Sequence, residues 1–354
     1  MALEIIARRY KTTSPFLMEV PMTNGMQRWK RVANILIACM LPAAAATGVS
    51  LLAGGAATAQ TASDRLIKVI CAVPAGSPVD VTARLVTNEW SKRTGTTVIV
   101  ENRPGGGGTI GAKDFAKADP DGHTLLFGAI GDAFAAKIAG YDPAKDYVPL
   151  ASAASWSWIL AVRPAIPASS LKQLIDHAKA NPGKLNWGFG QGTAPHMLGE
   201  MFKAAAGIEL ANIPYKSGTQ AVTDMLGGRI DINFSTVSNL LPLIREGKLR
   251  AVAITSEARS PELPDVPTMT ESGFPQLTRG DWTGFWAPPG TPASIVSRLN
   301  GEITAGLTTP EMKAAMKKLE FAPKVGSPQD FAKFIVAEID AWTPAAKVTG
   351  ILPK

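Results

Sequence analysis

The hydrophobic pattern of this chain alternates between short apolar runs and amphipathic segments, and it is clearest over residues 67–90. Residues 67–73 form an apolar run that is typical of a strand buried on both faces. Residues 74–78 contain two prolines and a glycine, which end the strand. An amphipathic segment begins at Pro78, directly after Ser77, a common helix N-cap residue. We therefore predict a strand, a turn and a helix whose free first-turn amides can bind an anion.

Strands continue to alternate with helices up to about residue 162. The pattern predicts strands at 97–101, 125–130 and 150–162, and a helix at 111–118. This alternation is typical of a parallel sheet covered by helices on both faces. Trp156 and Trp158 are two residues apart, so we expect them on one face of the strand at 150–162.

A second series of strands and helices begins at Pro164. It predicts helices at 171–180, 195–206, 219–226 and 240–245, and strands at 184–189, 212–215, 230–234 and 249–255. The chain then returns through an extended segment at 282–287 and ends in amphipathic helices at 295–307, 310–319 and 329–343. The pattern predicts an α/β fold of two lobes, joined by two crossings, with a cleft between them.

The expected domain division follows from these crossings. Residues 1–59 form an N-terminal extension and signal peptide. Residues 60–163 and 284–354 form a discontinuous first lobe, and residues 164–283 form the second lobe.

The N-terminal segment has the composition of an export signal. Basic residues at 28–31 precede an Ala- and Leu-rich stretch at 32–52, and Ala-Thr-Ala at 57–59 is a small-residue cleavage site. Cleavage near Ala59 predicts a periplasmic protein. A membrane anchor and a lipoprotein with its lipid on Cys39 are the alternatives. Met22 or Met26 is an alternative start of the chain.

Charge and cysteine content narrow the classes of partner. Without the first 59 residues, 30 basic side chains face 27 acidic ones, and no basic run has interleaved aromatic residues. We therefore expect no nucleic-acid partner. Cys71 is then the only cysteine, which excludes an internal disulfide, and its place in an apolar run predicts a packed core thiol.

Residues 188–196, GFGQGTAPH, repeat the strand–turn–helix pattern of residues 67–80. If the N-termini of both helices face the cleft, they can hold an acid with two anionic groups, one at each end. Two ordinary turns rich in Gly and Pro are the alternative interpretation.

Other motifs carry less information. Residues 106–111 match the dinucleotide fingerprint G-x-G-x-x-G, but residues 102–104 separate them from the strand, so we expect no dinucleotide site. Three histidines without ligand spacing predict no metal site, and the chain lacks the G-x-S-x-G motif of hydrolases. Asp80 is expected to fix its turn, with catalysis as the alternative, and His196 to pack its loop, with ligand contact as the alternative.

Specific segments occur in order along the chain. They include VPAGSPVDVTAR from Val73, VENRPGGGGTIGA from Val100, GTAPHMLGEMF from Gly192, GKLRAVAITS from Gly247 and LPDVPT from Leu263. Together these segments resemble the Bug family, the extracytoplasmic solute receptors of tripartite tricarboxylate transporters. The resemblance covers about residues 66–351. It implies a two-lobed periplasmic binding protein of type II, Venus flytrap-like, with two hinge crossings, no cofactor and no enzymatic activity.

The resemblance also implies which residues bind the ligand. In this family two strand–turn–helix motifs hold ligand carboxylates with main-chain amides. The corresponding residues here are Ala75, Gly76, Ser77, Val79 and Asp80 in the first motif, and Gly192, Thr193, Ala194 and His196 in the second. The chain departs from the family pattern at Val73, where an aromatic residue is usual, at Ser77, which replaces a glycine, and at Ser235, which replaces a frequent Asp.

Four tryptophans lie near the two crossings: Trp156, Trp158, Trp282 and Trp286. We hypothesise that at least one of them, with Trp158 as the first candidate, lines the cleft and favours a ligand with an apolar or aromatic body. Packing within the hinge is the alternative.

The implied function is a receptor that captures a small carboxylate, such as a di- or tricarboxylate, an amino acid or an aromatic acid, for uptake or sensing. Its expected partners are this ligand and either the membrane subunits of a tripartite transporter or a sensor protein, and the receptor is expected to be a monomer. The alternative is an exported α/β enzyme that acts on a carboxylate ester through Asp80 or His196.

Overall fold

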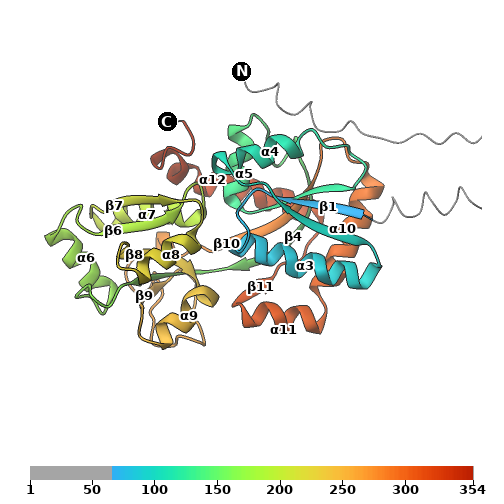
Figure 1. Cartoon of the computed structure of the whole chain (residues 1–354). Helices are drawn as coiled ribbons and strands as arrows, with labels where there is room; N and C mark the ends of the chain where they lie inside the picture. The colour runs from blue at the N-terminus through green and yellow to red at the C-terminus, as the bar shows by residue number, and fades with distance from the viewer. Residues whose placement is uncertain (1–65, 354) are drawn as a thin grey trace, which may run out of the picture. The chain divides into compact units, whose positions relative to one another are not determined.

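A computed structural model describes residues 66–353 (Figure 1). The expected signal peptide, its cleavage site near Ala59 and the alternative starts all lie outside the described residues. The described chain builds two sheets, each covered by helices, so the expected two-lobed α/β architecture is confirmed.

The first sheet has six strands in the order β11-β4-β10-β3-β1-β2. Their bounds are β1 Leu66–Cys71, β2 Thr97–Asn102, β3 Thr124–Gly128, β4 Val148–Trp156, β10 Asp281–Ala287 and β11 Phe321–Pro323. The sheet is mixed and not parallel throughout, because β10 runs antiparallel to both β3 and β4. The reason is topological: β10 enters from the other lobe, and therefore from the opposite end of the sheet.

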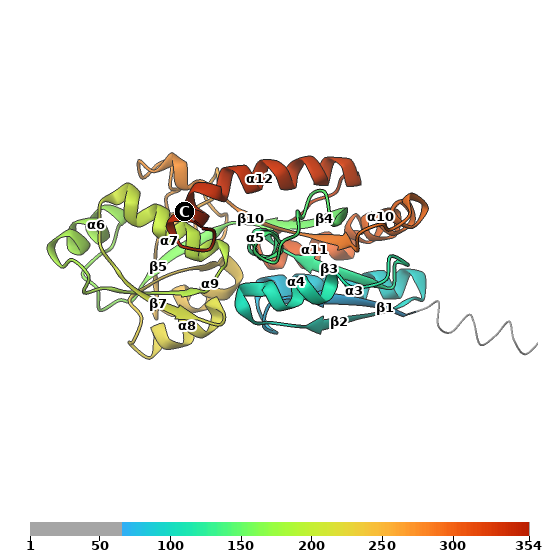
Figure 2. The ribbon, with the colours of Figure 1, turned by 90° about the horizontal axis from the view of Figure 1, so that it is seen from above.

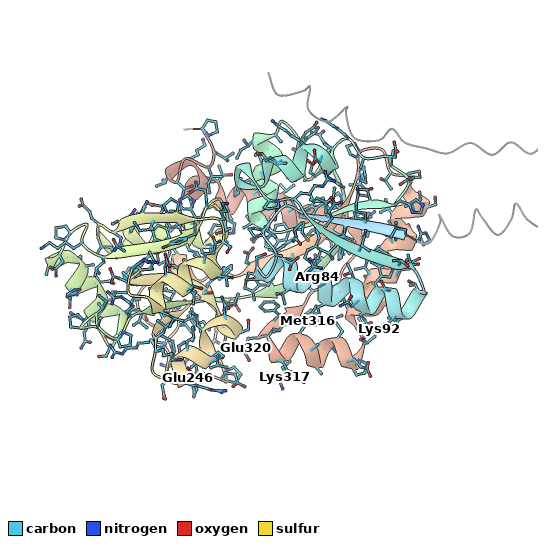
Figure 3. All side chains as sticks on the ribbon, in the orientation of Figure 1. Arg84, Lys92, Glu246, Met316, Lys317 and Glu320 are labelled. Carbon is cyan, nitrogen blue, oxygen red and sulfur yellow. The ribbon has the colours of Figure 1, made fainter. Side chains whose placement is uncertain are left out.

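Within residues 66–353, six α-helices belong to this lobe: α3 Pro78–Thr94, α4 Thr109–Phe115, α5 Ile130–Ile138, α10 Ala293–Leu307, α11 Pro310–Lys318 and α12 Pro328–Val348. The connection β1–α3–β2 moves toward the β2 edge of the sheet, whereas β2–α4–β3 moves in the opposite direction. Because both crossovers are right-handed, α3 and α4 lie on opposite faces of the sheet. On the α3 side, α10 and α11 complete the layer, and Met316 of α11 is fully buried near α3 (Figure 3).

The second sheet has five strands in the order β7-β6-β8-β5-β9. Its strands are β5 Trp158–Val162, β6 Asn186–Gly190, β7 Ala211–Tyr215, β8 Ile232–Thr236 and β9 Arg250–Ile254. Its helices are α6 Leu171–Ala180, α7 Ala194–Ala206, α8 Gly218–Leu226 and α9 Val237–Arg245, with the short 3-10 turn η2 Pro275–Leu277 before the return. The crossing strand β5 is antiparallel to β8 and β9, as β10 is to its neighbours.

The crossings lie earlier in the chain than the expected domain division. The expected strand at 150–162 is two strands of different sheets, separated at Ser157, and β10 lies wholly in the first sheet from Asp281 onward. Beside the first crossing the Trp158 amide donates to Thr255 Oγ1 at 2.9 Å, which continues the pairing of β5 with β9. Trp156 and Trp158 contact each other edge to face, with ring centroids 6.0 Å apart.

Helix α5 is absent from the pattern-based prediction, which extends the third strand to Ile130. Strand β3 ends at Gly128, Ala129 is extended, and its amide donates to Asp132 Oδ2 at 2.8 Å, which starts the helix. Most of α5 is buried, so it lacks the polar face that produces a helical period. A buried helix of this kind cannot be distinguished from a buried strand by periodicity.

Two of the four hinge tryptophans pack in the core of the first lobe. Trp282 and Trp286 both lie against Phe331 of α12, with ring centroids 5.7 and 5.2 Å from it. The thiol of Cys71 is also fully buried, as expected, and burial raises its pKa. Helix α12 continues beyond this core and its C-terminal part reaches α7 of the second lobe (Figure 2).

Candidate functional site

A cavity of about 610 Å³ lies between the loops that follow the parallel strands of both sheets. In the first sheet these loops follow β1, β2 and β3, and in the second they follow β6, β7 and β8. Successive connections reverse direction beside β1 and beside β6, so each sheet has a topological switch point there. Ligands of open α/β sheets bind at such points, outside the carboxyl ends of the strands. In this protein the switch points of both sheets border the same cavity.

The turn after β1 is held by Asp80. The amide of Gly76, which has a φ of +78°, donates to Asp80 Oδ2 at 2.9 Å, and Ser77 Oγ accepts from the Asp80 amide at 3.3 Å. Asn102 Nδ2 donates to Asp80 Oδ1 at 2.8 Å and to the Val73 carbonyl at 3.2 Å, so it joins both sides of the turn.

Burial alone would raise the pKa of Asp80, but hydrogen bonds from Arg84, the Gly76 amide and Asn102 hold that pKa below its ordinary value. Arg84, labelled in Figure 3, approaches the carboxylate with Nε at 3.1 Å from each oxygen. Asp80 therefore stays ionised and fixes the turn.

The turn after β6 is built differently. Gly192 has a φ of +78°, and the Thr193 hydroxyl donates to the Gly190 carbonyl at 2.8 Å. His196 is buried and stacks on Phe189, with ring centroids 4.2 Å apart and an interplanar angle of 2°. Burial lowers the pKa of His196 to about 4, so the ring is neutral and serves to pack the loop.

Five helices of eight residues or more have their first turn at the cavity wall: α3, α5, α7, α8 and α9. The first-turn amides of a helix have no acceptor within the helix. Among the described residues, the amides of Val79, Ala194 and Gly218 also have no acceptor elsewhere. These amides come from α3 in one lobe and from α7 and α8 in the other, so the cavity offers anion-binding donors from both lobes.

Most of the residues expected at the site lie in the cavity wall: Val73, Ser77, Val79, Trp158, Gly192, Thr193, Ala194 and Ser235. Their contact with a ligand remains a prediction. The other four, Ala75, Gly76, Asp80 and His196, lie outside the wall. Gly76 and Asp80 bind each other, His196 faces Phe189, and Ala75 is on the exposed side of the turn.

Sequence reasoning missed several parts of the wall. They are the glycine loop at 105–108, the start of α5 with Asp132, the start of α8 with Lys216, and the single residues Asn239 and Asp281. Ser217 before α8 is an N-cap like Ser77, accepting from the Gln220 amide at 3.4 Å, so the strand–turn–helix pattern that identified two turns could have identified this third one.

The two lobes touch across the cavity through glycines. A Cβ atom on Gly131 would lie 2.6 Å from the Gly192 carbonyl oxygen, and one on Gly192 would lie 3.6 Å from Gly107 Cα. Only residues without side chains allow the backbones to approach this closely. The described arrangement is therefore the closed one.

The cavity wall has charged side chains on two sides. Lys216 is its one Lys or Arg side chain among the described residues and is exposed. Asp132 and Asp281 are almost fully buried. Burial raises the pKa of Asp132 to about 6 against the opposing hydrogen bond from Ala129. Burial, together with the negative charges of Glu338 and Asp132, raises the pKa of Asp281 to about 7.

Residues 66–353 contain neither a metal-binding cluster nor a membrane-spanning helix. No group of His, Cys, Asp and Glu side chains there could hold a metal ion. In the same part of the chain, every helix is too short or too polar to cross a bilayer.

Comparisons with known proteins agree with this geometry. The family model described as the tripartite tricarboxylate transporter family receptor matches residues 82–351. The periplasmic binding protein BugD is 33% identical, with a TM-score of 0.75 over 81% of this chain and 98% of BugD. An R. palustris protein solved with adipate is 31% identical, with a TM-score of 0.74 over 81% and 97% of the two chains. MatC from Rhodopseudomonas palustris, with bound malate, is 30% identical, with a TM-score of 0.73 over 79% and 98%.

The family match covers most of the chain, and these structural neighbours cover nearly the whole described part. The chain therefore belongs to the receptor family of tripartite tricarboxylate transporters, to which the Bug proteins also belong.

Proposed function

We propose that the protein is a periplasmic receptor that binds a small carboxylate between its two lobes, for uptake or sensing, and that it catalyses no reaction. The observation that carries the proposal is the set of unpaired amides, of Val79, Ala194 and Gly218, which both lobes present to one cavity. A carboxylate accepts hydrogen bonds from such amides and is favoured by the positive ends of the helices.

The magnitudes favour binding by hydrogen bonds over binding by helix dipoles. Each dipole contributes about 0.3–1 kcal/mol at an exposed site. A hydrogen bond to a charged group contributes about 1.5–3 kcal/mol. Most of the affinity therefore comes from the amides.

The enzyme alternative depends on Asp80 and His196. Asp80 is engaged by Gly76, Asn102 and Arg84, and His196 is neutral and stacked on Phe189. Neither side chain lies in the cavity wall, which favours a receptor over an esterase.

The related structures with adipate and malate favour a dicarboxylate as the ligand. Lys216 at the cavity wall would pair with a second carboxylate of such a ligand. Trp156 and Trp158, also in the wall, are compatible with an apolar or aromatic body. If Trp158 favours such a body, Trp158→Ala will weaken benzoate-like acids more than aliphatic acids, and equal weakening of both classes would contradict this role.

The proposal extends to location and partners. Family members are periplasmic, so we place this protein in the periplasm after cleavage near Ala59. We propose that the receptor is a monomer and delivers its ligand to transporter membrane subunits or to a sensor protein.

The test begins with mass spectrometry of the acid that co-purifies with the protein, followed by a thermal-shift panel of small acids. A ligand that binds only the folded state stabilises it by about 2.7 kcal/mol at a hundredfold excess over Kd. The neutral methyl esters of the same acids serve as controls and should give no shift. A panel in which no acid stabilises the protein would overturn the proposal.

A matched pair of proline variants tests the amides directly. Gly218→Pro removes one donor at the first position of α8, where proline fits the helix. Ala293→Pro makes the same change at the first position of α10, away from the cavity. We expect Gly218→Pro to weaken acid binding by roughly tenfold to a hundredfold, and Ala293→Pro to leave it unchanged. Equal affinities of the two variants would contradict anion binding by these amides.

A further inference from the structure

Two buried carboxylates in the cavity wall have no role in the anion-binding scheme. Asp132 and Asp281 are 6% and 5% exposed, and both residues lie in the cavity wall. Asp132 Oδ2 accepts from the Ala129 amide at 2.8 Å, and Asp281 Oδ1 accepts from the Trp282 amide at 2.9 Å. Within residues 66–353, no Lys or Arg side chain forms an ion pair with either carboxylate.

These carboxylates separate the cavity into two electrostatic sides. Two of the protein's own acids lie at the start of α5: Asp132 accepts from the Ala129 amide, and the Ile130 amide interacts with Asp281. A ligand carboxylate at that helix would meet like charge. The carboxylate of the ligand therefore belongs at the starts of α3, α7 and α8, and a group of different chemistry belongs beside Asp132 and Asp281.

The neighbouring indoles identify that group. Trp156 pairs with Asp281 in the register of β4 and β10 and therefore adjoins the acidic side, and Trp158 contacts Trp156 edge to face. Trp156 and Trp158 are 4% and 5% exposed and lie in the wall, and neither Nε1–H has an acceptor in the described part of the chain. A buried donor without a partner is costly. This side of the cavity thus combines carboxylate acceptors with unpaired indole donors.

A hydroxyl group is both donor and acceptor, whereas an ammonium group only donates and a methylene group does neither. We infer that the receptor selects a hydroxy acid, whose hydroxyl donates to Asp132 or Asp281 and accepts from an indole N–H. This inference rests on the proposed carboxylate-binding function and adds the chemistry of the second group.

The test compares acids that differ at one substituent. In four-carbon diacids the series is malate, aspartate and succinate, and in three-carbon monoacids it is lactate, alanine and propionate. Isothermal titration should show both hydroxy acids binding at least tenfold more tightly than their unsubstituted partners. Succinate and propionate binding as tightly as malate and lactate would overturn the inference and leave the receptor function intact. Tightest binding of the amino acids would also overturn it, in favour of an ammonium group. If no acid of either series binds, the inference fails, and the receptor function fails with it only if the wider panel of acids also gives no stabilisation.

Variants separate recognition from folding. Asp281→Asn keeps the shape of the side chain and removes the carboxylate, so the preference for the hydroxy acid should fall below threefold while succinate affinity is kept or improved. Asp340→Asn on the exposed side of α12 is the matched control and should keep the full preference. If Asp281→Asn does not fold, Trp158→Phe retains the ring without the N–H and should also reduce the preference. An unchanged preference in a folded Asp281→Asn variant would overturn the role of Asp281, and an unchanged preference in a folded double variant, Trp156→Phe with Trp158→Phe, would overturn the role of the indoles.

Discussion

Closure of the cavity should depend on the absence of a side chain at Gly131. This residue is the second of α5, and its φ lies outside the left-handed region, so alanine fits the local backbone. Alanine is favoured over glycine in a helix by about 1 kcal/mol, so Gly131→Ala should not weaken α5 itself. Its effect should therefore appear only where the lobes meet.

The size of the clash follows from the closed geometry. The new Cβ would lie 2.6 Å from the Gly192 carbonyl oxygen and 3.5 Å from Thr193 Cα, whereas ordinary contacts begin at 3.4 Å. The obstacle is backbone, which cannot rotate away as a side chain can. The lobes must stay apart by roughly 0.8 Å at this point, which lengthens the amide contacts to a ligand held by both lobes. Loss of one hydrogen bond to a charged group costs about 1.5–3 kcal/mol, so we expect roughly tenfold to a hundredfold weaker binding.

Isothermal titration with the co-purified acid measures the affinity, and small-angle scattering with and without the acid measures closure. Gly301→Ala is the matched control, because Gly301 lies within α10 and a Cβ there meets no atom within 4 Å. We expect Gly131→Ala to compact less on acid addition than the wild type, and Gly301→Ala to behave as the wild type. Wild-type affinity and full compaction of Gly131→Ala would refute this account of closure.

Three further variants test the buried ionisable groups. The pKa of Asp281 is raised to about 7 from 3.8, so its contribution to stability is complete below pH 3.8 and is lost as the pH rises through 7. Urea unfolding should therefore show Asp281→Asn gaining stability relative to the wild type over this range, and parallel pH profiles would contradict the shift. The pKa of His196 is lowered to about 4 from 6.5, so its contribution is present above pH 6.5 and is lost as the pH falls towards 4. His196→Phe keeps the stack on Phe189 and should remove this acid-side loss; the same loss in the variant would rule out His196 as its source. Asp80→Asn weakens the contacts with Gly76 and Arg84 and should lower the free energy of unfolding by about 1–3 kcal/mol, together with acid affinity; unchanged values for both would show that the turn does not depend on this charge.

Several features could be predicted from the sequence because they arise from neighbouring residues. Ser77 caps α3 and Pro78 occupies its first turn, as the sequence predicts. Asp80 fixes the turn through Gly76, four residues away, and His196 packs its own loop. Such short-range hydrogen bonds and caps depend on local chain geometry and hardly on the rest of the fold.

Other features could not be predicted because they depend on which strands become neighbours. The sequence indicates strands and helices, but it does not indicate how the two crossing strands are placed. Strand β5 crosses into the second sheet and β10 crosses back into the first, and each runs antiparallel to its neighbours. Helix α5 escapes prediction because it is buried on nearly all sides. Asp132 and Asp281 lie far apart in sequence, and only the pairing of β10 with β3 and β4 brings both to one cavity.

The sequence by itself thus determined two strand–turn–helix units with free amides, because hydrogen bonds between residues a few positions apart specify each unit. Only the tertiary structure decided that α5 and α8 also start at the cavity, that glycines let the lobes touch, and that two buried carboxylates face the same space as the amides. The physical reason is the sequence separation of the interacting residues. Helix capping acts between residues within one turn of the chain, whereas the charge balance of the cavity depends on contacts between residues distant in sequence.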